Sequence, residues 1–164
     1  MSSRVLVALR VKAPPSRAFE VFTGQIGMWW RPNPLFRFTP RSPGVLAFEC
    51  GEGGRLIETL PNGKVFEIGE VRIWDPPHRL VVSWRQATFA ADQTTEVEVR
   101  FQAVGEETRV TVEHTGWDSV PAAHTARHGL PDAVFLRRHG EWWQALLASL
   151  AHRVIQRDAG QGGE

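Results

Sequence analysis

The sequence predicts an α+β domain in which a curved antiparallel sheet covers one long C-terminal helix. A strand-like stretch and two short helical stretches open the chain, about six alternating stretches separated by turns follow, and one long amphipathic stretch closes it. The alternating stretches have a single apolar face, and the closing helix is the only long one available to cover it. We expect one domain over residues 1–158 and a flexible tail over residues 159–164.

The opening stretches are short and separated by helix breakers. Residues 4–11 alternate apolar and polar side chains, which predicts a strand with one buried face. Ser16 is placed to cap a short helix that runs to about Phe22. A second helical turn is expected at residues 26–30, before the proline-rich segment 31–34 forces an extended turn.

The pattern in the middle of the chain predicts a series of hairpins. Residues 61–63, Pro-Asn-Gly, are a hairpin signal because asparagine and glycine tolerate positive φ. Alternation with one apolar face indicates antiparallel pairing with one solvated face. The predicted strands cover residues 45–50, 55–60, 65–74, 79–86, 97–101 and 108–115.

The closing helix is expected from about Asp132 to about Asp158. Pro131 interrupts what precedes it, and aspartate suits a helix N-terminus. At 1.5 Å per residue, roughly 27 residues make a rod about 40 Å long. Its apolar face consists of Phe135, Leu136, His139, Trp142, Trp143, Leu146, Leu147, Leu150 and Val154.

Composition and charge exclude several classes of protein. A net charge of +1 with scattered arginines gives no electrostatic case for nucleic-acid binding. No apolar run approaches the roughly 20 residues of a membrane span. The N-terminus lacks the pattern of a signal peptide, and a lone Cys50 cannot form an internal disulfide. We therefore expect a cytoplasmic location.

Few residues carry the pattern of a metal or catalytic centre. Cys50 lies on an alternating strand and is interpreted as a small core residue. His124 and His128 are four residues apart, but no third ligand accompanies them. No glycine-rich phosphate loop enters a helix, and no paired carboxylates fall on the predicted interior faces. We expect no metal and no cofactor.

Two histidines are expected to point into the interior. His114 ends a strand on the same face as Val110 and Val112, and His139 lies on the apolar face of the helix. One interpretation is that both are satisfied by backbone partners at the edge of a cavity. The other is that one of them orients a polar atom of a ligand, or acts as an acid or base.

A concave sheet packed on a straight helix tends to leave a gap, which is where a ligand would bind. Aromatic side chains are candidates to line this gap, although for most of them a place in the core is the simpler interpretation. The predicted pocket residues are Trp29, Trp30, Phe48, Trp84, Phe101, His114, Phe135, His139, Trp142, Trp143 and Leu146.

Several motifs carry a family resemblance over roughly residues 5–155. They are the opening P-x-x-x-A-F-x-x-F with W-W over residues 14–30, the segment 69–84, the segment 111–117, and the helix pattern W-x-x-x-L-x-x-L from Trp143. The chain resembles the START-like (SRPBCC) superfamily, and is most similar to homologues of the activator of the ninety-kilodalton heat-shock chaperone's ATPase (AHSA-type). This resemblance implies a helix-grip (Bet v-like) fold, with six to seven strands gripping the C-terminal helix over a hydrophobic cavity.

The resemblance leaves three functions open. The first is binding of a small hydrophobic or aromatic ligand without a catalytic set. The second is a cyclase-, aromatase- or hydrolase-like enzyme that uses His114 or His139. The third is a chaperone-associated stress-response module, although no segment of this chain corresponds to the domain with which the eukaryotic activator engages the chaperone. Trp142 stands where the family often has glycine, and so reshapes the expected pocket.

Two further expectations concern surfaces. Exposed strand edges make a homodimer an expected form. Residues 118–131 are expected to form either a short helix or loop leading into the long helix, or a lid over the cavity mouth.

Overall fold

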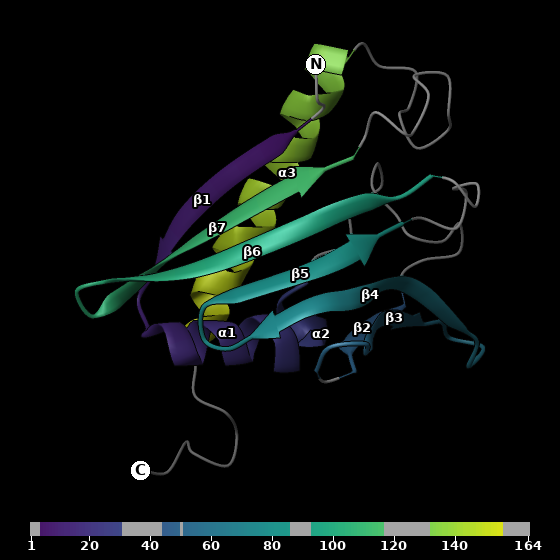
Figure 1. Ribbon diagram of the computed structural model, residues 1–164, viewed down its shortest axis with the longest axis horizontal. Helices are drawn as coiled ribbons and strands as arrows, with labels where there is room; N and C mark the ends of the chain where they lie inside the picture. The colour runs from purple at the N-terminus through teal and green to yellow at the C-terminus, as the bar shows by residue number, and fades with distance from the viewer. Residues whose placement is uncertain (1–3, 31–43, 50, 86–92, 117–131, 156–164) are drawn as a thin grey trace.

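The computed structural model describes residues 4–30, 44–49, 51–85, 93–116 and 132–155. Within these residues it contains one antiparallel sheet and three helices, which confirms the predicted α+β helix-grip architecture (Figure 1). The elements in chain order are β1 Val5–Val11, α1 Pro15–Gly24, α2 Ile26–Trp29, β2 Val45–Phe48, β3 Arg55–Thr59, β4 Val65–Asp75, β5 Arg79–Trp84, β6 Thr95–Val104, β7 Glu107–Thr115 and α3 Asp132–Val154.

The sheet follows the chain from β2 to β7 and then adds β1 at its far edge. Its order is β1-β7-β6-β5-β4-β3-β2, with every neighbouring pair antiparallel. The first strand therefore pairs with the last, and His114 of β7 lies between Val5 of β1 and Val97 of β6. This register places His114 inside the sheet rather than at an edge.

Helix α3 lies behind the sheet in Figure 1 and crosses β1 and β7. Gly140 faces β1, where an added Cβ would meet methyl groups of Val5 and Val7 at 3.8 and 3.9 Å. The predicted apolar face is confirmed, because all its members are buried except the half-buried Leu136. The predicted start at Asp132 is also confirmed. The helix ends at Val154, short of the predicted end, and residues 156–158 lie outside the described part of the chain.

Helix α1 begins one residue before the predicted cap. Pro14 is the N-cap residue and Pro15 is the first helical residue, so the prediction that Ser16 caps this helix is wrong. The physical reason is that proline suits the first helical position, where its fixed φ is already helical and no backbone N–H is needed. Phe19 and Phe22 are buried beneath the helix.

Gly69 permits a close approach of β4 and β5 beside an irregularity in the β3–β4 pairing. A Cβ built on Gly69 would lie 1.5 Å from the carbonyl oxygen of Ser83. We expect Gly69→Ala to lower the free energy of unfolding by about 1–3 kcal/mol or more, since backbone must move to accept the methyl group. Urea unfolding measures this change.

A matched control is Gly24→Ala at the end of α1, where an added Cβ meets nothing within 4 Å. This variant is expected to unfold at or slightly above the parent's urea midpoint, because alanine favours helix over glycine. Equal midpoints for Gly69→Ala and the parent would show that the two strands separate easily at this point.

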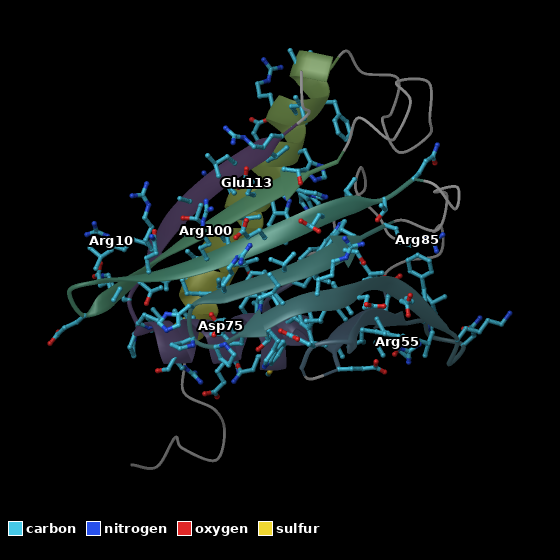
Figure 2. The ribbon with its side chains drawn as sticks, viewed as in Figure 1. Arg10, Arg55, Asp75, Arg85, Arg100 and Glu113 are labelled. Carbon is cyan, nitrogen blue, oxygen red and sulfur yellow. The ribbon has the colours of Figure 1, made fainter. Side chains whose placement is uncertain are left out.

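The solvent face of the sheet carries charged side chains that form ion pairs with one another. Figure 2 shows Arg100 and Glu113 on the neighbouring strands β6 and β7. Glu113 lies 3.2 Å from Arg4 and 3.8 Å from Arg100, and Arg79 pairs with Glu98. Such exposed pairs contribute little stability, but they balance the arginines of this face with carboxylates. None of the described helices combines the length and apolar character needed to cross a membrane.

Candidate functional site

The two interior histidines lie in a cage of tryptophans where α3 meets the sheet. We call this group the histidine–tryptophan cluster. Its members are Trp30 after α2, Trp84 at the end of β5, His114 of β7, and His139, Trp142 and Trp143 of α3. The ring centroids of His114 and His139 are 4.9 Å apart, and each histidine also contacts a tryptophan ring, His114 that of Trp84 at 5.8 Å and His139 that of Trp142 at 5.0 Å. The packing of α3 on the sheet thus brings the two predicted histidines together.

The tryptophans contact one another as well as the histidines. Trp30 lies between the sheet and the helix, with ring centroids 5.7 Å from Trp84, 5.5 Å from Trp142 and 5.9 Å from Trp143. Phe135 stacks on His139, with centroids 5.5 Å apart and planes inclined by 28°. The cluster is therefore continuous from β5 to the first half of α3.

A chain of hydrogen bonds runs through this cluster. The indole N–H of Trp143 donates to Nδ1 of His114 at 3.2 Å, and Nε2 of His139 lies 3.1 Å from the same nitrogen. On the other side of the ring, Nε2 of His114 lies 2.7 Å from the hydroxyl of Thr95. That hydroxyl donates to the backbone carbonyl of Trp84 at 2.8 Å.

This arrangement assigns the tautomers. An indole N–H can only donate, so Nδ1 of His114 is the acceptor and a neutral His114 carries its proton on Nε2. Nε2–H then donates to Thr95, whose own proton is directed to the Trp84 carbonyl. A neutral His139 donates through Nε2–H to His114, and its Nδ1 becomes the acceptor nitrogen. His114 therefore positions His139, as a partner orients the ring of a catalytic histidine.

Burial keeps His114 neutral. The residue has no exposed surface, and this desolvation lowers the pKa of its imidazole from 6.5 to about 3. Protonation at Nδ1 would also place a new N–H against the indole N–H of Trp143. His114 is therefore a fixed hydrogen-bonding group at neutral pH.

The other predicted pocket residues are distributed over a wider region. Trp29 is buried, and its indole N–H donates to the carbonyl of Val21 at 3.0 Å. Phe101 packs against Phe19 and Phe22 of α1 rather than against the histidines. Phe48 lies apart from the cluster and lines a cavity beside α1. Leu146 is fully buried under α3.

The sequence patterns did not single out Thr95 or Glu58. Thr95 precedes Val97 by two residues on β6, and this spacing was the available signal that its hydroxyl faces the interior. Glu58 follows Leu56 by two residues on β3 and is only 1 % exposed. One of its carboxylate oxygens accepts a hydrogen bond from the backbone N–H of Gly44 at 3.1 Å. Only paired carboxylates on interior faces were considered from the sequence, so a single buried one such as Glu58 was not considered.

Among the described residues, no group of three or more histidine, cysteine or acidic side chains is placed to hold a metal ion. Cys50, His124 and His128 lie outside those residues, as do the segment 118–131 and the tail 159–164. The assignments of a core thiol, a lid and a flexible tail stay predictions.

Comparison with known proteins identifies relatives of the whole domain. The family described as Activator of Hsp90 ATPase homolog 1-like protein matches residues 12–154. No significant match to a functionally curated protein was found.

Solved structures of similar fold include one relative with substantial sequence identity. It is the anthrahydroquino-γ-pyrone synthase Txn09, which is 30% identical, covers 93% of this chain and 96% of its own, and superposes with a TM-score of 0.55. The Hsp90 activator PFC0360w from Plasmodium falciparum is 21% identical, with coverages of 90% and 93% and a TM-score of 0.60. The protein MLL2253 from Mesorhizobium loti is 18% identical, with coverages of 94% and 98% and a TM-score of 0.64. The last two support the fold alone.

Proposed function

This chain belongs to the family of Activator of Hsp90 ATPase homolog 1-like proteins, and from that premise we propose that it binds a small, flat, apolar molecule beside the histidine–tryptophan cluster. In this proposal the tryptophans supply the apolar walls and His139 supplies one polar contact. A ligand of this kind would be an aromatic molecule with a single hydroxyl donor.

The observation that carries the proposal is the buried chain of hydrogen bonds from Trp84 through Thr95 and His114 to His139. Burying polar groups costs free energy unless they are hydrogen-bonded, and these bonds hold both imidazole rings in fixed orientations within an apolar surrounding. On the sheet side the chain ends in the backbone carbonyl of Trp84. On the helix side it directs the acceptor nitrogen of His139 away from His114. An apolar site with one oriented acceptor favours a ligand that donates one hydrogen bond.

Paired probes test this proposal. We expect 2-naphthol to bind about tenfold more tightly than 2-methoxynaphthalene, because only the naphthol donates a hydrogen bond to His139. Quenching of tryptophan fluorescence measures both affinities. In His139→Phe the preference should disappear, while the phenyl ring keeps the stacking on Phe135.

The control for this experiment is His152→Ala, which removes an exposed histidine from the same helix. It should preserve the preference for naphthol. Equal binding of both probes to the parent protein, or an undiminished preference in His139→Phe, would contradict the proposed contact.

A second candidate function is that the same site catalyses a proton transfer on such a ligand. The 30% identity to an anthrahydroquino-γ-pyrone synthase favours this candidate. Here His139 accepts the proton on Nδ1, and its Nε2–H bond to His114 stabilises the resulting charge.

This candidate predicts catalysed deuterium exchange at the methyl group of 2-acetyl-1-naphthol, followed by NMR. The exchange should be lost in His139→Phe and kept in His152→Ala. If the parent protein binds this compound but does not catalyse exchange, the enzymatic candidate is wrong and the proposed binding function is unaffected.

A further inference from the structure

A cavity lies beside α1 and shares no lining residue with the histidine–tryptophan cluster. Its volume is about 440 Å³, enough for a small organic molecule, and it opens between α1, the end of β2 and the turn that follows β4. The lining residues are Ser16, Phe19, Glu20, Thr23, Gly24, Phe48, Trp74, Pro76 and Pro77. None of them belongs to the cluster described above.

Aromatic rings form the walls of this cavity. Phe19 and Trp74 meet with centroids 5.2 Å apart and planes at 86°, so their rings make a corner. Phe19 is almost fully buried and braced by Phe101, whereas Trp74 is half-buried at the cavity surface. Phe48 contributes a third ring from β2. The negative faces of such rings attract cations, and a group of them is the usual device for binding an ammonium ion.

The ionisable side chain at the cavity is a carboxylate, whose negative charge would attract a cation. Among the described residues that line it, Glu20 is the only ionisable one, and its side chain is 64% exposed. Arg17 forms an ion pair with Glu20 at 3.6 Å, and its Nε also donates to the carbonyl of Val154 at 3.5 Å. The hydroxyl of Thr23 is committed to the backbone carbonyl of Phe19 at 2.8 Å. The cavity therefore combines apolar aromatic walls with one carboxylate at the rim.

We propose that this cavity binds an organic ammonium ion, with its alkyl groups against Phe19, Phe48 and Trp74 and its charge near Glu20. An anionic ligand is disfavoured by Glu20, and a neutral one makes apolar contacts with the rings but lacks the attraction of a full positive charge to the carboxylate and to the ring faces. Neither His114 nor His139 lines this cavity, so the absence of ammonium binding here would not affect the function proposed above.

The test compares choline with 3,3-dimethylbutan-1-ol, in which carbon replaces the charged nitrogen. Titrations followed by NMR of the tryptophan indole N–H groups should show choline binding roughly three- to tenfold more tightly, with the shift centred on Trp74. Trp74→Leu identifies that resonance and should weaken choline binding.

Glu20→Gln changes an exposed side chain and so should fold as the parent does. It should remove most of the preference for choline and leave binding of the alcohol unchanged. Glu106→Gln is the control, because this exposed carboxylate does not line the cavity. Equal affinities for the two probes in the parent protein, no binding of choline, or an unchanged preference in Glu20→Gln would each overturn the proposal.

Discussion

Acidification from pH 6.5 toward pH 3 is expected to remove up to about 5 kcal/mol from the free energy of unfolding through His114 alone. Burial lowers the pKa of His114 to about 3 in the folded protein, whereas the unfolded chain has the ordinary value of 6.5. Between these values the unfolded chain binds a proton that the folded protein does not. This contribution to stability is therefore complete above pH 6.5 and is lost as the pH falls.

Urea unfolding at pH 6.5, 6.0, 5.5 and 5.0 measures this effect before most carboxylates titrate. The expected loss from His114 is about 0.7 kcal/mol per pH unit at pH 6.5 and approaches about 1.4 kcal/mol per pH unit below pH 5.5. His114→Gln should be less stable at neutral pH, and its free energy of unfolding should lack this part of the dependence on pH. His78→Asn, which removes an exposed histidine from the turn after β4, should retain it. If His114→Gln does not fold, NMR of the His114 ring in the parent protein tests the same assignment. A titration of these ring signals near pH 6.5 would contradict a buried neutral ring.

Leu146→Ala is expected to lower the free energy of unfolding by about 2–5 kcal/mol. Leu146 has no exposed surface and packs in the core cluster beneath α3, so its removal leaves a hole between the helix and the sheet. Gln144→Ala, on the exposed side of the same helix, should change stability by no more than about 0.5 kcal/mol. Equal urea midpoints for Leu146→Ala and the parent would mean that this side chain does not fill the interface.

The periodic elements could be predicted because their patterns follow from simple geometry. Side chains three or four residues apart share a helix face, which is why residues from Phe135 to Val154 predicted the buried face of α3. Alternation likewise predicted that His114 faces inward with Val110 and Val112. The start of α1 was missed because a serine cap and a first-turn proline compete in the same short segment.

The contacts between elements could not be predicted from those patterns. Periodicity places a residue on a face, but the coil of the sheet and the path of the helix decide which residue it meets. Thus Phe101 and His114 both face inward, yet Phe101 meets α1 whereas His114 meets α3. The bond from Thr95 to the Trp84 carbonyl depends on how β5 and β6 end, which no pattern of apolar residues specifies.

Native mass spectrometry of the freshly purified protein, followed by extraction of whatever is bound, tests the proposed binding function most directly. We expect a stoichiometric aromatic or otherwise apolar molecule carrying a hydroxyl group, retained by the parent and by His152→Ala and lost from His139→Phe. A mass equal to that of the chain alone, together with no fluorescence response to 2-naphthol or to other apolar aromatic molecules, would contradict the account.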